Sequence, residues 1–115
     1  YRRRGKKMKV YQLRLTDLNM LLEPVFESKE SAMLFMSKYH NRAVNIEENI
    51  ISIPKNNYVY RILKNDEEGY ELLDNIFADI EETKKFIENG CLDDCQIVRE
   101  SLLNNKNFNY QLIEV

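Results

Sequence analysis

The side chains with the clearest chemical potential are the carboxylates between residues 66 and 94. This stretch contains eleven acidic residues and two lysines, Lys84 and Lys85, so its local net charge is −9. Closely spaced carboxylates imitate the phosphates of a nucleic acid, and their field speeds association with a basic surface. We therefore expect an acidic face that binds a host or phage protein with a basic surface. The residues assigned to this face are Asp66, Glu67, Glu68, Glu71, Asp74, Glu81 and Glu82.

The acidic stretch also has a simpler explanation. Exposed acids raise solubility without any partner, and acids near helix starts are favoured by the helix dipole. The sequence therefore leaves two interpretations open for residues 66–94, a docking face and a solvated surface.

Other reactive side chains are few. His40 is the single histidine, and no recognisable motif supplies a nucleophile that it would activate. Cys91 and Cys95 offer two metal ligands, whereas a structural zinc site needs about four. We expect no catalytic residue, no metal site and no cofactor. The alternative is an enzyme or enzyme subunit that combines His40 with acidic residues, and it requires a deep polar pocket.

The two cysteines fall on a helical spacing. Cys91, Cys95, Val98 and Leu102 are separated by four, three and four residues, which is the pattern of one apolar helix face. We expect buried, reduced thiols on a helix.

Basic residues gather at the start of the chain. Residues 1–7 carry five of the 17 basic residues and no acid, which leaves residues 8–115 with 12 basic and 19 acidic residues. Arg-Arg can be encoded by AGG-AGG, a ribosome-binding sequence, and Met8 follows shortly after. We therefore expect residues 1–7 to be a translated leader or a disordered basic arm, and residues 8–115 to form a single α+β domain.

A direct nucleic-acid binder is a second alternative. It would use the basic residues 2–9 together with aromatic rings that stack on bases. The candidate rings are Tyr11, Tyr58, Tyr60, Phe108 and Tyr110. Strand aromatics more often fill a core and brace cross-strand pairs, so we expect these rings to be packed inside.

The elements that must position these residues can be read from the hydrophobic periodicity. Alternation predicts strands at residues 8–15, 43–46, 50–53, 58–63, 70–73 and 108–115, with a loop at 16–22 and a short extended piece at 24–26. One helix should begin at the cap Ser28 and end near residue 41, and a second should run from Asp79 to Gly90. A third helix is expected from Asp93 or Asp94 to about Leu103.

Two segments match at an offset of 51 residues. In each, an apolar pair ending in Phe26 or Phe77 precedes a capping residue, an acid and then Phe35 or Phe86. We expect an α+β fold in which a mixed or antiparallel sheet carries two to three helices on one face. It would be built from two ββα-like repeats followed by a C-terminal helix and strand.

The first of these segments carries a resemblance. Lys9-Val10-Tyr11, a turn, and then Val25-Phe26-x-Ser28-x-Glu30-x-Ala32 resemble the opening of small, mostly uncharacterised proteins of Gram-positive bacteria and their phages. The match covers about a third of the chain. It implies a phage or mobile-element origin and brings no known activity.

The composition agrees with that origin. Asn occurs 13 times and Ile ten times against three Ala, a bias typical of AT-rich coding. No apolar run approaches the ~20 residues of a membrane span, and we expect the protein in the cytoplasm of a bacterial host. The function expected overall is a small, acidic, non-catalytic interaction protein that inhibits or modulates a host nucleic-acid-binding protein.

Overall fold

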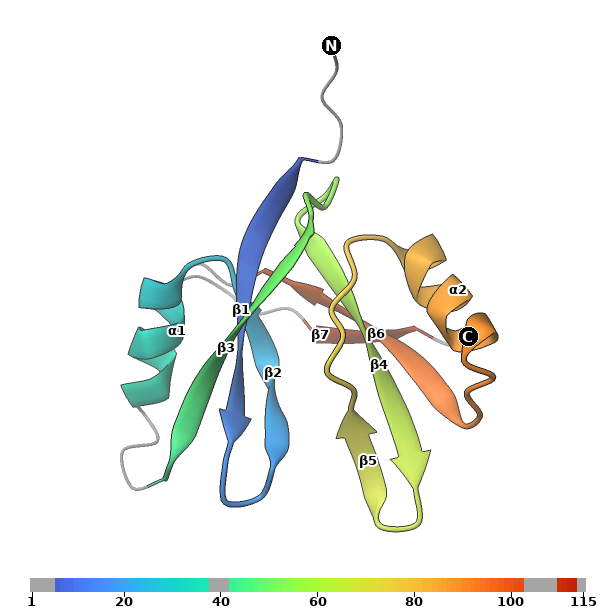
Figure 1. Ribbon diagram of the computed structural model, residues 1–115, viewed down its shortest axis with the longest axis horizontal. Helices are drawn as coiled ribbons and strands as arrows, with labels where there is room; N and C mark the ends of the chain where they lie inside the picture. Colours follow the sequence, from blue (N-terminus) through green and yellow to red (C-terminus); the bar gives the residue numbers. More distant parts are fainter. Residues whose placement is uncertain (1–5, 38–41, 103–109, 114–115) are drawn as a thin grey trace.

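The computed structural model describes residues 6–37, 42–102 and 110–113 (Figure 1). The chain is α+β, as expected, and every strand pair is antiparallel. The elements in chain order are β1 (Lys7–Leu15), β2 (Met20–Phe26), α1 (Lys29–Met36), β3 (Val44–Ser52), β4 (Tyr58–Asp66), β5 (Gly69–Leu72), α2 (Ile80–Asn89), β6 (Cys95–Ser101) and β7 (Tyr110–Ile113).

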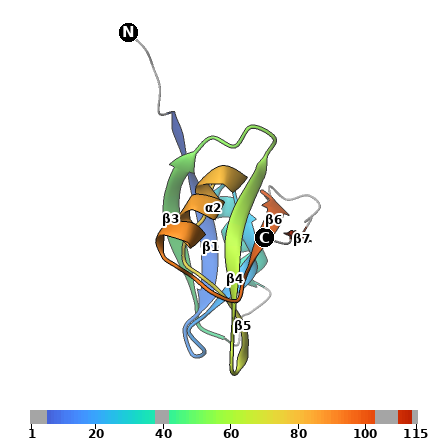
Figure 2. The ribbon, with the colours of Figure 1, turned by 90° about the vertical axis from the view of Figure 1, so that its right-hand side faces the viewer.

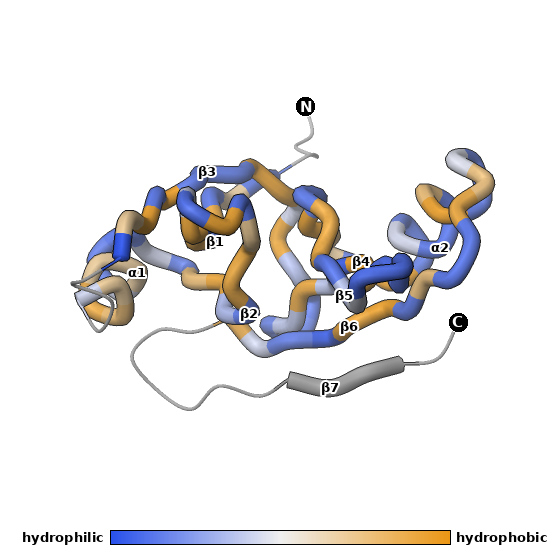
Figure 3. The backbone as a smooth tube through the Cα atoms, turned by 90° about the horizontal axis from the view of Figure 1, so that it is seen from below, coloured by the Kyte–Doolittle hydropathy of each residue, from blue (hydrophilic) through white to orange (hydrophobic). Residues whose placement is uncertain are grey.

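The strands form two sheets, so the expectation of one sheet was wrong. The N-terminal sheet has the order β2-β1-β3, and the C-terminal sheet has the order β5-β4-β6-β7. In each half a hairpin is followed by a helix and then by a strand that pairs with the first strand of that half. The two helices lie at opposite ends of the molecule, each beside its own sheet (Figures 1 and 3).

The expected third helix is a strand, β6. Its residues Cys95–Ser101 pair with seven residues of β4. The β-branched pair Ile97 and Val98 suits a strand. Their side chains point to opposite faces of the sheet, and both are fully buried, so both faces are covered at this point. The helical spacing of Cys91, Cys95, Val98 and Leu102 was therefore a coincidence of local sequence.

Pairing with β1 also lengthens two of the expected strands. Residues 47–49 were expected to separate two short strands, yet β3 runs unbroken through them because it pairs with all nine residues of β1. The second is β2: the β1–β2 hairpin turns at residues 16–19, so β2 begins at Met20, inside the segment expected to be a loop. Pro24 is tolerated in β2 because β2 is an edge strand.

The helix starts follow their expected caps. The Ser28 hydroxyl accepts a hydrogen bond from the Ser31 N–H at 3.1 Å, and the Asp79 carboxylate accepts from the N–H groups of Glu81 and Glu82. These side chains satisfy donors that the first helical turn leaves free. Helix α1 ends at Met36, earlier than expected.

One core lies between the two sheets, and a second lies under α1. Hydrophobic and polar residues alternate along the strands in Figure 3, and Figure 2 shows β1 and β3 in a layer separate from β4. Val10 of β1 joins Val59 of β4 in the core between the sheets. Leu13, on the other face of β1, packs with Phe26 and with Ala32 of α1.

The same interface contains a charged residue, Arg61 of β4, whose side chain is fully buried. Its Nη1 donates to the backbone carbonyl oxygen of Glu23 at 2.6 Å and to that of Leu22 at 3.3 Å, both in β2. The same Nη1 lies 3.1 Å from a carboxylate oxygen of Glu100 in β6, and Nη2 donates to the side-chain oxygen of Gln12 in β1 at 3.0 Å. Arg61 therefore connects strands of both sheets.

Glu100 is buried with Arg61, but only one of its two carboxylate oxygens is hydrogen-bonded within the described part of the chain. One carboxylate oxygen accepts from Arg61, and the other has no hydrogen-bond partner in the described part of the chain. Burial raises the pKa of Glu100 to about 7, although the charge of Arg61 and its hydrogen bond oppose that rise, and the charge of Glu23 adds to it. Desolvation outweighs the attraction because a single hydrogen bond compensates the carboxylate incompletely.

Replacing Arg61 should destabilise the fold. Arg61→Met leaves the Glu100 carboxylate and two β2 carbonyl groups without their donor in the interior. We expect a loss of about 3–5 kcal/mol in the free energy of unfolding, measured by urea denaturation. The double variant Arg61→Met/Glu100→Leu should recover part of that loss, because both buried charges are then absent.

The matched control is Arg42→Met, which breaks an exposed ion pair with Asp17. We expect it to cost less than about 1 kcal/mol. Equal losses for Arg61→Met and Arg42→Met would contradict a structural role for the buried cation.

Stability should also depend on the protonation of Glu100. Between its usual pKa of 4.5 and its native pKa of about 7, the folded state binds more protons than the unfolded state. The free energy of unfolding should therefore fall as the pH rises through this window. Urea denaturation from pH 4.5 to 8 measures how the free energy of unfolding changes with pH. Glu100→Gln should remove the part of this pH dependence that Glu100 causes. An unchanged slope in Glu100→Gln would refute the assignment to Glu100.

Candidate functional site

All seven acids assigned to a docking face are exposed, but they fall into two groups. The β4–β5 hairpin and the segment after it carry Asp66, Glu67, Glu68, Glu71 and Asp74, whereas Glu81 and Glu82 stand in the first turn of α2. The hairpin turn and the start of α2 lie at opposite ends of the C-terminal sheet (Figures 1 and 2). The fold thus brings the first group together and leaves the α2 pair apart from it.

Two of the hairpin carboxylates have local partners. Asp66 accepts a hydrogen bond from the Glu68 N–H at 2.9 Å within the turn. Asp74 lies 2.6 Å from Nη2 of Arg14 and is neutralised by it. Within the residues that the structure describes, Glu67, Glu68 and Glu71 form no ion pair. We call Asp66, Glu67, Glu68 and Glu71 the hairpin acids.

Two further acids lie beside the hairpin. The turn before β6 brings Asp93 and Asp94 next to β4, where the backbone oxygen of Asp94 accepts from the Asn65 N–H at 2.9 Å. Lys64 donates to the backbone oxygen of Asp93 at 3.1 Å. Both carboxylates are exposed, so they add to the negative charge at this end.

A cleft between the two hairpins was not predicted from the residue pattern. The β1–β2 and β4–β5 turns point to the same end of the molecule (Figures 1 and 2), and a cavity of about 880 Å³ lies between them. Four exposed apolar side chains line it: Leu18, Met20, Tyr70 and Phe86. These are half of the eight large exposed hydrophobic residues in the described ranges.

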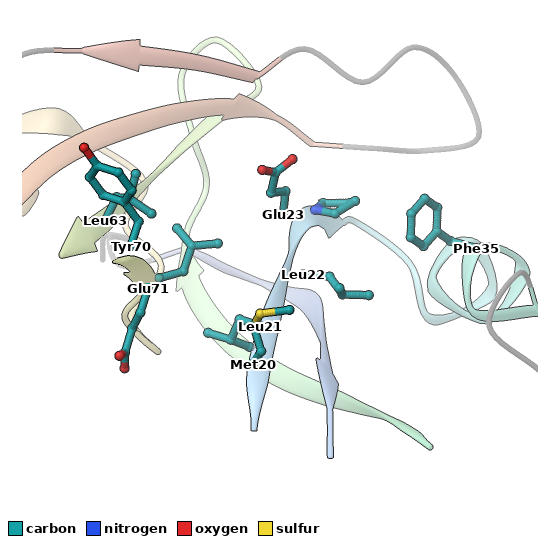
Figure 4. Close-up of a pocket in the computed structure, with 10 residues that line it drawn as sticks. Met20, Leu21, Leu22, Glu23, Phe35, Leu63, Tyr70 and Glu71 are labelled. Atoms are coloured by element: carbon teal, nitrogen blue, oxygen red, sulfur yellow. The ribbon is translucent and has the colours of Figure 1, made fainter. Parts of the chain in front are cut away.

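A second hollow of about 600 Å³ adjoins the first (Figure 4). Both are lined by Met20, Leu21, Tyr70, Glu71 and Leu72, so we treat them as one feature, the hairpin cleft. In Figure 4, Leu21 and Leu22 of β2 stand opposite Leu63 and Tyr70. The Glu71 carboxylate points out of the hollow in the same view. The smaller hollow therefore has mainly apolar walls, the larger one a mixed lining with more polar surface, and acidic side chains surround both.

Arg14 closes the base of the cleft between the two halves. Its guanidinium donates to Glu47 of β3 at 2.7 Å, to Asp74 at 2.6 Å and to Asn19 at 3.2 Å. The hydrogen bonds to Glu47 and Asp74 raise the pKa of Arg14, which stays charged. Because two carboxylates compensate it, Arg14 does not offset the negative charge of the rim.

Sequence reasoning missed the apolar side of this site for two reasons. Leu18 and Met20 were assigned to a loop, and Tyr70 was assigned to a strand at residues 70–73 with no role in a site. Tyr70 is 64% exposed and Leu18 is 57% exposed. The signal that would have found them is large apolar residues in or beside turns, where exposure is the rule.

The cysteines were expected to be buried on a helix, and that expectation was wrong. Cys91 is exposed in the turn between α2 and β6, and Cys95 is half-buried at the start of β6; both are free thiols. The chain reverses through left-handed backbone at Cys91 and Asp94, with φ of 50° and 54°. Asp93 and Asp94 therefore belong to this turn and not to the start of a helix.

The enzyme alternative depends on His40, and the nucleic-acid-binding alternative depends on residues 2–9 and five aromatic rings. His40 and Phe108 lie outside the described residues. Tyr60 is buried, Tyr11 packs beside α1, and the Arg99 guanidinium lies 4.6 Å from the Tyr58 ring centre. Lys7 and Lys9 belong to β1, where Lys9 pairs with Glu48 at 3.7 Å. Tyr110 stands in β7, opposite Glu100 of β6. Of the five candidate rings, those of Tyr11, Tyr58 and Tyr60 are thus engaged in packing.

The described ranges contain neither a cluster of metal ligands nor a membrane-spanning helix. No three His, Cys, Asp or Glu side chains there come together as metal ligands would. Neither described helix combines the length and apolarity needed to cross a membrane.

Comparisons of this chain with protein-family models, curated proteins and solved structures find no match.

The two thiols should differ in reactivity. Cys91 is exposed, whereas burial raises the pKa of Cys95 and lowers its thiolate fraction. With a chromogenic disulfide reagent at pH 8 we expect a fast phase that Cys91→Ser removes and a slow phase that Cys95→Ser removes. Equal rates for the two thiols, or no reaction before unfolding, would contradict this placement.

Proposed function

We propose that this chain is a small, acidic, non-catalytic interaction protein that binds and modulates a nucleic-acid-binding protein. It docks through the end of the molecule formed by the β4–β5 hairpin. The observation that carries the proposal is the exposure of all eleven acids of residues 66–94 together with the gathering of the hairpin acids and Asp93 and Asp94 at one end. A field of this sign attracts the basic surface with which such a partner holds phosphates.

The docking face that we propose contains fewer acids than the seven that the sequence indicated. Glu81 and Glu82 lie at the other end of the C-terminal sheet (Figure 1), and Asp74 is compensated by Arg14. Charge that is already paired contributes little to long-range steering. The face proposed to meet the partner is therefore centred on the hairpin acids.

We also infer that the two halves are repeats of one unit. Three observations support this inference: the same hairpin–helix–strand order in each half, a capping residue at Ser28 and Asp79, and matched ring pairs. The Phe26–Phe35 and Phe77–Phe86 ring centres are 5.4 and 5.3 Å apart, with interplanar angles of 52° and 54°. A repeat would make the two hairpins equivalent, which accounts for their pointing to the same end.

The proposed setting is the cytoplasm of a bacterial host that carries the gene on a phage or mobile element. The support is the resemblance carried by residues 9–11 and 25–32 and the AT-rich pattern of residue use. Small acidic proteins of this kind act by occupying a basic surface that would otherwise hold nucleic acid.

Charge reversal at the hairpin tests the proposal. The tagged chain is used to isolate a binding partner from a low-GC Gram-positive host lysate, and the partner is then purified for kinetics. We expect an association rate that falls with ionic strength and competition by a DNA duplex for the same partner. The variant Glu67→Lys/Glu68→Lys/Glu71→Lys should slow association about tenfold or more, because steering contributes at least that factor.

The matched control is Glu81→Lys/Glu82→Lys, which reverses acids of α2 away from the hairpin. We expect this variant to bind the partner at close to the original rate. Binding that ignores the hairpin variant, or a partner that binds the chain and DNA simultaneously without competition, would overturn the proposal.

A further inference from the structure

We propose that the hairpin cleft binds a basic segment of the partner and receives one of its apolar side chains between Met20 and Tyr70. This inference rests on the proposed function and specifies the chemistry of the docked segment. It assigns a binding role to apolar residues that the acidic stretch alone does not explain.

The first support is the clustering of exposed apolar surface. Met20 of β2 is 45% exposed and Tyr70 of β5 is 64% exposed, and both line the two adjoining hollows. Leu18 and Phe86 extend the apolar lining on one side. Apolar side chains gathered in a hollow and rimmed by polar groups are the usual mark of a docking site, because an apolar anchor buried there gains much of the binding energy.

The second support is charge complementarity. The charged residues that line the two hollows are five acids and one base: Glu23, Asp66, Glu68, Glu71, Asp74 and Arg14. Arg14 is held by Glu47 and Asp74, so the remaining carboxylates face a ligand without compensation by a lining cation. A segment carrying Lys or Arg beside an apolar residue satisfies both the rim and the walls.

The third support is the fixed position of both walls. Arg61 holds the backbone carbonyls of Leu22 and Glu23 in β2, and Arg14 holds the segment after β5 through Asp74. Both contacts join one half of the chain to the other, which fixes the separation of the two hairpins. A site that is formed before binding costs less ordering entropy when the ligand arrives.

The strands at the cleft also suit an extended ligand. Both β2 and β5 are edge strands of their sheets. Within the described part of the chain, each pairs with a strand on one side only. The Leu22 and Glu23 carbonyl groups of β2 already accept from Arg61, so a peptide would pair with the remaining edge groups. This feature favours an extended segment over a helix.

The probe for this inference is a fluorescein-labelled heptapeptide of alternating lysine and leucine, titrated with the full chain in an anisotropy assay. A heptapeptide of alternating lysine and serine has the same charge but no anchor. We expect the leucine peptide to bind about tenfold more tightly or better, because burying one large apolar side chain contributes at least that factor. Equal affinities for the two peptides would overturn the inference.

Two pairs of variants locate the binding. Met20→Ser/Tyr70→Ser removes the proposed anchor contacts, and Met33→Ser/Leu34→Ser removes exposed apolar residues of α1 as a control. We expect the first pair to weaken the leucine peptide about tenfold and the second to change its affinity less than about twofold. Circular dichroism and urea denaturation check that each variant is folded, and equal effects of the two pairs would contradict docking in the cleft.

Charge variants separate this inference from the proposed function. If Glu68→Lys/Glu71→Lys abolishes peptide binding while Met20→Ser/Tyr70→Ser leaves it unchanged, the acidic end binds basic ligands and the apolar anchoring is wrong. If neither pair affects the peptide, both proposals fail. An equal loss on Glu81→Lys/Glu82→Lys would indicate attraction by net charge and would also overturn the cleft.

Discussion

A fully buried guanidinium, that of Arg61, sets the relation between the two sheets. Its donors reach the carbonyl oxygens of Leu22 and Glu23 and the side chains of Gln12 and Glu100, so four strands meet at one side chain. A buried ion stays compatible with folding only when its hydrogen bonds are made. The sheets are therefore held at a defined separation and register, which apolar contacts alone would specify less strictly because such contacts are not directional.

That constraint also accounts for the cleft. The carbonyl groups held by Arg61 belong to the strand that forms one wall, and Arg14 fixes the segment behind the other wall through Asp74. Beyond these two points the hairpins carry Leu18, Met20 and Tyr70, whose side chains stay exposed. The exposed Met20 and Tyr70 are thus a consequence of how the halves are joined.

The charge of the molecule is distributed according to the same geometry. Most exposed acids of residues 66–94 occupy turns and a helix start, while the buried acid Glu100 is matched to a buried cation. Of the exposed acids that line the hairpin cleft, Asp74 is paired with Arg14, whereas Asp66, Glu68 and Glu71 form no ion pair within the described residues. This end of the molecule thus combines exposed acids with a hollow, whereas Glu81 and Glu82 stand in the first turn of α2, at the other end of the C-terminal sheet.

The residue pattern alone determined the α+β class, the caps Ser28 and Asp79 and the acidic character of residues 66–94, because each depends on neighbours a few positions away. Tertiary structure decided that residues 95–101 form a strand, since only pairing with β4 outweighs their helical spacing. It also decided that the strands divide into two sheets and that only five of the seven assigned acids gather at the β4–β5 hairpin. Leu18 and Tyr70, more than fifty positions apart in the chain, line one cleft because Arg61 and Arg14 join the halves, and hydrogen bonds across such separations leave no local pattern in the sequence.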